Sequence, residues 1–268
     1  MPDKNAEIKK DPVVIESWMF RKKEEIPSLI YSIFLLILLS LLLNQFESLF
    51  YLWFIGIFLI IFTAYIMNST EKGTSLLITR DQLPEIYELF EKLSNKLDVK
   101  NVRLYIKQSP VYNAFAFGVF QKTIVLHSSL VDDFSKEELE FVLAHELGHI
   151  KAGHTVANAF IPKLPTLPFP FSIVNEILSG FYDRNCEYTC DRCAIAVTKN
   201  PVAGVKTILK LMAGKSVVNK ADFSSLADQI RGSRDIGVWL AELVSTHPFP
   251  VKRINHMLKF SKEVLVKR

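Results

Sequence analysis

Two long apolar runs near the N-terminus constrain the fold of this chain more than any other feature. Residues 28–43 and 46–67 are almost wholly apolar, and only Asn44 and Gln45 separate them. Each run has close to the ~20 residues that a helix needs to cross a bilayer, and neither has a polar face. We therefore predict a transmembrane helical hairpin over residues 28–67. The alternative that the runs leave open is a buried hairpin of a soluble protein.

Basic residues flank the two runs and predict their orientation. Residues 21–23 are all basic and precede the first run, Lys72 and Arg80 follow the second, and the turn between the runs has no Lys or Arg. Because basic residues stay on the cytoplasmic side of a membrane, both termini are expected there. The chain is then a multi-pass protein of the cell membrane, with a cytoplasmic tail (residues 1–27) and a domain that faces the cytoplasm.

The rest of the composition argues against a nucleic-acid partner and against a disulfide framework. The formal net charge is only +4, and no cluster of Lys and Arg with interleaved aromatic residues occurs. The cysteines Cys186, Cys190 and Cys193 form an odd set on one short segment, which favours a reducing compartment. We interpret them as packing residues, because three thiolates along one helix face cannot easily converge on one ion.

Residues 73–268 have the composition of a soluble domain. Their patterns predict an α+β fold that is mainly helical, with a small antiparallel sheet. Apolar residues at helical spacing cover residues 81–97, and Ser135 with Glu138 forms a capping box that begins a helix running to about His154. Runs rich in β-branched and aromatic residues predict a meander of three strands, at 102–106, 114–117 and 123–126.

The segment 155–172 is apolar and rich in proline, so it cannot form one continuous helix. We predict a non-helical apolar loop that touches the membrane or covers the cleft. A third membrane span between Thr155 and Tyr182 is the alternative. Helical periodicity returns at Ile173, and residues 182–197 predict a second functional helix.

The predicted helix after Ser135 contains the motif His-Glu-x-x-His at residues 145–149. Residues four apart project from one face of a helix, so His145 and His149 can reach one metal ion at Zn–N distances of about 2.0 Å. Glu146 lies beside that face, where it can act as general base toward an attacking water. A catalytic zinc ion also needs a third protein ligand.

Glu187 is the candidate for that third ligand, on the predicted helix 182–197. Asp191 follows four residues later and can accept the free N–H of a ligand histidine. An ordinary surface pair, with contacts to Arg184 or Arg192, is the alternative. Among the other histidines, His247 is the stronger candidate for a functional residue, because it begins a His-Pro-Phe-Pro turn. The remaining ones are interpreted as surface or packing residues: His127, His154 and His256.

Four segments together resemble the HtpX-like family of membrane zinc metallopeptidases, relatives of the CAAX prenyl proteases. They are NAFAFG at 113–118, HELGH at 145–149, EYTCD at 187–191 and THPFPVKRI at 246–254. The resemblance implies a gluzincin-type domain that holds one Zn²⁺ ion per chain. Better-known members have two further spans between the second and third of these segments. Here that interval is shorter and proline-rich, so a four-span topology is not carried over.

The resemblance also implies roles for individual residues. The zinc ligands would be His145, His149 and Glu187, with Glu146 activating the water and Asp191 supporting the ligands. Asn113 and His247 would hold the substrate and the oxyanion, and Arg253 would brace either the ligands or the turn. An exposed edge strand would bind an extended peptide through Ala114, Phe115 and Ala116.

The predicted activity is that of a membrane-anchored zinc endopeptidase. Its substrates would be misfolded or membrane-associated proteins, as in quality control, and the lipid bilayer would be its other partner. One alternative is a dedicated processing protease for a single peptide or lipidated substrate. A non-catalytic membrane sensor that binds zinc is the second alternative, and the presence of Glu146 argues against it.

Overall fold

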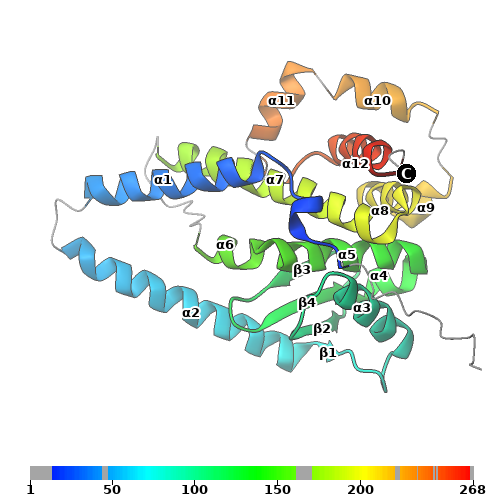
Figure 1. Cartoon of the computed structure of the whole chain (residues 1–268), viewed down its shortest axis with the longest axis horizontal. Helices are drawn as coiled ribbons and strands as arrows, with labels where there is room; N and C mark the ends of the chain where they lie inside the picture. Colours follow the sequence, from blue (N-terminus) through cyan, green and yellow to red (C-terminus); the bar gives the residue numbers. More distant parts are fainter. Residues whose placement is uncertain are drawn as a thin grey trace, which may run out of the picture.

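The computed structural model describes residues 14–43, 48–160, 171–220, 224–233, 235–243, 245 and 247–265. Helices dominate these residues and surround a small sheet (Figure 1), which confirms the predicted α+β, mainly helical class. The strands are β1 (Leu76–Leu77), β2 (Val102–Lys107), β3 (Ala114–Phe117) and β4 (Lys122–His127). The helices are a 3-10 turn (Ser17–Met19), α1 (Glu25–Leu43), α2 (Ser48–Thr74), α3 (Pro84–Lys96), α4 (Ser128–Asp133), α5 (Lys136–Ala152), α6 (His154–Phe160), α7 (Phe171–Thr198), α8 (Pro201–Ala213), α9 (Lys215–Val218), α10 (Leu226–Gly232), α11 (Ile236–Leu243) and α12 (Pro250–Leu265).

The two apolar runs form helices α1 and α2, which extend from the same side of the domain (Figure 1). Helix α1 packs along α7, and α2 leads into β1. Large apolar side chains on both helices are exposed, among them Phe34 (61%), Phe58 (63%) and Tyr65 (67%). Within the described part of the chain, no helix is both long enough and apolar enough to cross a membrane. The transmembrane hairpin stays a prediction.

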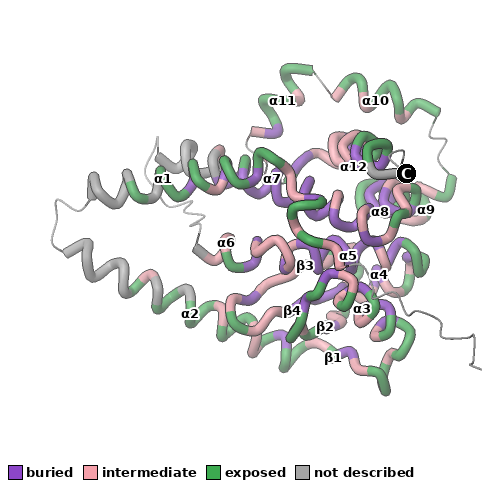
Figure 2. The backbone as a smooth tube through the Cα atoms, viewed as in Figure 1, coloured by how far each residue is buried: buried purple, intermediate pink, exposed green. Residues whose placement is uncertain are grey.

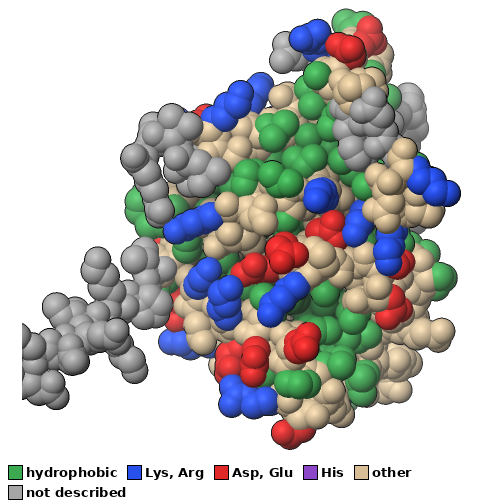
Figure 3. Space-filling model, turned by 90° about the vertical axis from the view of Figure 1, so that its right-hand side faces the viewer, with side chains coloured by type: hydrophobic (Ala, Val, Ile, Leu, Met, Phe, Trp, Pro, Cys, Tyr) green, Lys and Arg blue, Asp and Glu red, His purple; other side chains and the backbone are tan. Residues whose placement is uncertain are grey.

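The surface of the domain differs from that of α1 and α2. Buried residues concentrate around α5, α7 and the inner strands (Figure 2). On the face turned toward the viewer in Figure 3, acidic and basic side chains are interspersed with apolar ones. Such a mixed surface is typical of a domain in contact with water.

The sheet is mixed, so the predicted antiparallel meander is wrong. The strand order is β1-β2-β4-β3, with β4 parallel to β2 and antiparallel to β3. Burial explains this order: residues 124–126 of β4 are fully buried, whereas Ala114–Phe117 of β3 is only half-buried. A strand that is apolar on both faces takes the central position. Strand β3 is left at the edge of the described sheet.

Helix α5 lies between the sheet and helix α7, and both contacts are close. Its side chains Leu143 and Leu147 are fully buried. Gly148 allows the approach to α7, because a Cβ at this position would lie 3.1 Å from the Cβ of Cys193. All three cysteines are buried and free, and Cys193 packs against α5 as the sequence predicted.

The ends of α5 follow from its capping residues. Ser135 accepts a hydrogen bond from the Glu138 amide, and the Glu138 carboxylate accepts one from the Ser135 amide, which confirms the capping box. Gly153 ends the helix in the left-handed conformation with a φ of 83°.

The predicted loop 155–172 is wrong at both ends, because α6 continues to Phe160 and α7 begins at Phe171. Its proline-rich part, 161–170, lies outside the described residues.

Candidate active site

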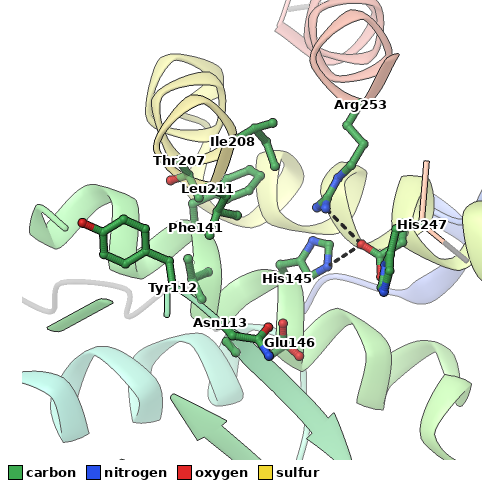
Figure 4. A pocket seen from close by; sticks show the side chains of 13 residues that line it. Tyr112, Asn113, Phe141, His145, Glu146, Thr207, Ile208, Leu211, His247 and Arg253 are labelled. Atoms are coloured by element: carbon green, nitrogen blue, oxygen red, sulfur yellow. Dashed lines mark ion pairs between the residues drawn. The ribbon is translucent and has the colours of Figure 1, made fainter. Parts of the chain in front are cut away.

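Three helices bring the predicted site residues together around one cavity. Helix α5 contributes the two histidines and the glutamate of the motif, α7 contributes two carboxylates, and α12 contributes an arginine. Figure 4 shows His145 and Glu146 from α5, Arg253 from α12, and Asn113 and His247 from the segments before β3 and α12 around the cavity. His149 and Asp191 each contact His145 and lie outside the lining of this cavity. The residues brought together are Asn113, His145, Glu146, His149, Glu187, Asp191, His247 and Arg253.

Three potential ligand groups, two imidazoles and one carboxylate, face one another at similar distances. The Nε2 atoms of His145 and His149 are 3.3 Å apart. The Glu187 carboxylate lies 3.5 Å from His145 Nε2 through Oε2 and 3.6 Å from His149 Nε2 through Oε1. Two ligands at about 2.0–2.1 Å from a tetrahedral ion are separated by about 3.4 Å. The residues therefore fit a small tetrahedral cation such as Zn²⁺.

Asp191 and Arg253 lie behind these ligand atoms and fix their orientation. Asp191 Oδ1 is 3.1 Å from Nδ1 of His145, the ring nitrogen that faces away from Glu187. Arg253 donates to both oxygens of Asp191, through Nε at 2.9 Å and Nη2 at 2.7 Å. Its Nη1 lies 3.2 Å from Glu187 Oε2. The sequence left open what Arg253 braces, and in the structure it contacts the two carboxylates.

The charges of the site keep these carboxylates ionised. Burial alone would raise the pKa of Glu187, but Arg253 and the histidines His145 and His247 hold it well below its usual range. The same guanidinium holds the pKa of Asp191 below its usual range against the effect of burial. An ionised carboxylate beside two imidazoles is the donor set that a divalent cation requires.

Glu146 is buried beside the ligands, with only 6% of its surface exposed. Burial raises its pKa to about 7, Glu187 acts in the same direction, and His145 opposes it. A carboxyl group with a pKa near neutrality can both take and return a proton. In Figure 4, Glu146 and Asn113 lie close together at one end of the cavity.

The cavity has a volume of about 280 Å³ and two chemically different ends. One end carries the charged residues described above. The other end is apolar and lies between α5 and α8 (Figure 4). This arrangement can hold a peptide bond at the charged end and an apolar side chain beside it. The apolar part of the lining comprises Phe141, Val142, Ile208 and Leu211.

The edge strand β3 enters this cavity at its N-terminal end. Asn113 and Ala114 line the cavity, while the Asn113 carbonyl accepts a hydrogen bond from the His127 amide. The strand Ala114–Phe117 pairs with β4 on one side only among the described strands. A strand in this position can pair with an extended peptide through its unpaired main-chain groups.

His247 precedes α12 and contacts the site from the solvent side. Its side chain is 71% exposed, and its Nδ1 lies 3.4 Å from Glu187 Oε1. The contact with Glu187 raises the pKa of His247. Glu242 holds the turn by accepting hydrogen bonds from the Phe249 amide at 2.9 Å and from Lys252 Nζ at 2.6 Å. His247 is thus fixed at the entrance of the cavity.

A second possible donor set overlaps the first. A ring nitrogen of His145, a ring nitrogen of His149 and the Cys190 thiol lie within 4.8 Å of one another. Burial raises the pKa of Cys190 well above its usual range, so this thiol resists the deprotonation that a metal ligand requires. Glu187 is ionised and lies close to both Nε2 atoms, so it fits the third position better.

Two residues near the site were missed in the sequence interpretation. His154 was interpreted as a surface or packing residue, yet it is 1% exposed and its Nδ1 lies 3.1 Å from Nδ1 of His149. Glu25 has no role in the sequence interpretation, yet it is also 1% exposed and contacts His154. A charged residue at the start of an apolar run is a signal that could have identified Glu25.

The helix-borne motif, the carboxylate from the next long helix and the adjacent edge strand define the class of HExxH metallopeptidases. Residues 81–261 match Peptidase family M48, and the chain belongs to this family. The HtpX-like resemblance predicted from the sequence is thereby confirmed, because several relatives are HtpX proteases.

One relative is the chloroplastic "Plastoglobule-localized metallopeptidase 48" of Arabidopsis thaliana, which is 29% identical over 220 residues. That alignment covers 75% of this chain and 64% of the relative, so the chain spans less than two thirds of that protein. A "Protease HtpX homolog" of Acaryochloris marina is 25% identical over 222 residues, covering 70% of this chain and 76% of the relative. Another, from Streptococcus uberis, is 24% identical and covers 67% and 75%.

Proposed function

We propose that this chain is a membrane-anchored zinc endopeptidase that cleaves misfolded or membrane-associated proteins. The observation that carries the proposal is the spacing of three potential ligand groups, the imidazoles of His145 and His149 and the Glu187 carboxylate, close to the separations of a tetrahedral site. Glu146 lies beside these atoms, and an edge strand that can bind a peptide enters the same cavity.

The donor set of two imidazoles and one carboxylate favours zinc as the metal. When bound, zinc would polarise the peptide carbonyl and make the attacking water more acidic. Glu146 takes a proton from that water as it attacks, and then delivers the proton to the leaving nitrogen. The pKa of about 7 suits Glu146 to both transfers.

Asn113 and His247 position the substrate in this proposal. Asn113 lies where β3 enters the cavity, so its amide can bind the main chain of a peptide that pairs with the strand. His247 is at the solvent side of the cavity and can donate a hydrogen bond to the carbonyl oxygen as it becomes negative. Such a donor contributes roughly 2.7–4 kcal/mol to the stability of the transition state.

The membrane part of the proposal rests on the apolar side chains of α1 and α2. Large apolar residues such as Ile30, Phe34, Phe58 and Tyr65 are exposed on these helices. A water-soluble protein seldom exposes so large an apolar surface unless something covers it. The basic residues that flank the runs favour a cytoplasmic position for the domain.

A second cavity supports substrates that lie close to the bilayer. It has a volume of about 240 Å³ and is lined by Thr63, Ala64 and Met67 from α2, by the end of β3 and by His149. The last turns of the predicted second span therefore form part of the peptide-binding region. A peptide on β3 would reach both cavities, because Ala114 lines the first and Ala116 and Phe117 line the second.

Removal and return of the metal test the proposal on the detergent-purified full chain. Treatment with a zinc chelator should abolish cleavage of casein, and added Zn²⁺ should restore it. Cleavage that persists in metal-free protein would contradict a zinc peptidase. Cleavage of one peptide but not of unrelated unfolded proteins would favour the dedicated processing protease instead.

A further inference from the structure

His149 has a buried partner that the reaction described above does not use. Its Nε2 faces His145 and Glu187, so Nε2 is the nitrogen available to a metal. The opposite ring nitrogen, Nδ1, then carries the hydrogen. His154 Nδ1 lies 3.1 Å from it, and the two rings meet edge to face with centroids 5.1 Å apart. His154 must therefore accept through Nδ1 and carry its own hydrogen on Nε2.

The other side of His154 faces a carboxylate from the N-terminal segment. His154 Nε2 is 3.2 Å from Glu25 Oε1, and both side chains are only 1% exposed. Among the described residues, His154 Nε2 makes no hydrogen bond of good geometry. Glu25 Oε1 is close enough to accept one after a small change in the orientation of either side chain. The Cys190 thiol also lies 3.5 Å from His154 Nδ1, but a thiol is a weak hydrogen-bond partner.

Glu25 is held in place by the same helices that form the site. Thr189 Oγ1 and the Arg21 guanidinium both donate to its carboxylate. Thr189 lies on α7, two residues after Glu187. Arg21 also donates to the Ala152 carbonyl at the end of α5, at 2.6 Å.

The neighbouring residue Lys22 attaches the segment further. Its amide donates to Thr189 Oγ1 at 3.0 Å, and its Nζ donates to Asn185 Oδ1 at 2.8 Å. In Figure 1 the start of α1 lies beside α7, in agreement with their packing contacts. Residues 21–25, just before the first apolar run, therefore pack against the helices α5 and α7 that carry the site.

We infer that His154 and Glu25 are positioning residues that orient the ligand His149. The two histidines then have comparable support: His145 Nδ1 lies 3.1 Å from Asp191 Oδ1, and His149 Nδ1 lies 3.1 Å from His154 Nδ1, whose Nε2 is 3.2 Å from Glu25 Oε1. Partners of this kind fix the ring orientation of a metal ligand and raise its basicity. The inference rests on the proposed zinc site, and it makes the N-terminal segment a part of that site.

Zinc affinity measured by competition with a chromogenic chelator tests the inference on the full chain in detergent. His154→Leu should weaken Zn²⁺ binding by about 10- to 100-fold. His154→Asn should recover most of the affinity, because its Oδ1 can accept from His149 Nδ1. Glu25→Gln, which keeps the size of the side chain, should weaken binding by several-fold. His256→Phe is the matched control, since it removes a histidine that contacts Tyr188 and not the ligands.

The absorption spectrum of the Co²⁺-loaded protein provides a second measurement. It should change in His154→Leu and stay close to the parent in His154→Asn, which a purely structural role would not produce. Parental affinity in His154→Leu, or equal losses in the Leu and Asn variants, would overturn the inference. If His154→Leu does not fold, unchanged affinity in Glu25→Gln would overturn it. A parent that binds no Zn²⁺ would instead contradict the proposed function.

Discussion

At the scale of single residues, the site separates direct ligation from support. The Glu187 carboxylate faces the Nε2 atoms of both histidines. Of the two histidines, Asp191 contacts His145, through the outer nitrogen Nδ1. Glu187→Ala should therefore lose zinc at neutral pH, and Asp191→Ala should weaken zinc binding by about 10- to 100-fold. Metal analysis after dialysis against a weak chelator measures both. Equal zinc content in Glu187→Ala and the parent would remove Glu187 from the ligand set.

His256 predicts a dependence of stability on pH that is independent of the metal. Burial lowers its pKa to about 4, and Lys22, Lys259 and Arg192 act in the same direction against Asp191. Its ring stacks on Tyr188 with centroids 4.1 Å apart. The unfolded chain, with a histidine pKa near 6.5, binds a proton that the folded chain does not bind.

The contribution of His256 to stability is therefore complete above about pH 6.5 and decreases as the pH falls toward 4. The decrease at pH 5.5 is on the order of 1 kcal/mol. His256→Phe keeps the ring contact with Tyr188, so its melting temperature in detergent should fall less than that of the parent between pH 7 and pH 5. If the melting temperatures of the two proteins fell equally between pH 7 and pH 5, His256 would not be the cause of the pH dependence.

How much of the site could be predicted depended on how local each signal is. His145, Glu146 and His149 lie within one helical turn, so spacing alone placed them on a common face. Glu187 was predicted from the pattern of a second helix, and the resemblance to a family then implied the same ligand. The contact between His154 and Glu25 could not be predicted, because it joins residues 129 positions apart in sequence and depends on how α1 packs against α7.

At the scale of secondary structure elements, the capped start of α5 was more predictable than the order of the strands. The capping box of α5 is a local pattern, and the structure has it where the sequence predicts it. The place of β4 between β2 and β3 depends on which strand the helices bury, and adjacent strand patterns do not contain this information. The position of β3 at the edge, which the proposed peptide binding needs, follows from that order.

The second cavity makes a prediction for helix α2. Ala64→Trp should fill the space between α2 and β3, raise the KM for casein and leave the zinc content unchanged. Ile66→Trp is the control, because Ile66 is on the same helix but 45% exposed and outside the cavity lining. Normal KM values in Ala64→Trp would mean that substrates do not use this cavity.

At the scale of the whole molecule, the N-terminal segment joins the apolar helices to the site. Residues 21–25 bind α7 and the end of α5, and α2 lines a cavity that His149 also lines. The proposed anchor and the proposed active site are therefore parts of one packed structure. The composition of the chain predicted an apolar part and a soluble domain, but not that they share the site.

Membrane anchoring can be tested on the intact chain. If α1 and α2 are inserted in the bilayer, the protein should stay with membranes during extraction at alkaline pH, which releases proteins attached only through charge. Release into the supernatant would contradict insertion. A cysteine at Ser172 should stay unlabelled by an impermeant thiol reagent from the outer face, and strong labelling there would support a third span instead.

The most direct test of the central claim compares the parent and Glu146→Gln, both purified in detergent as full chains. We expect about one zinc ion in each protein and cleavage of casein by the parent alone, because the glutamine keeps the ligands but cannot transfer a proton. Cleavage at the parental rate by Glu146→Gln, or a parent without zinc, would contradict the claim.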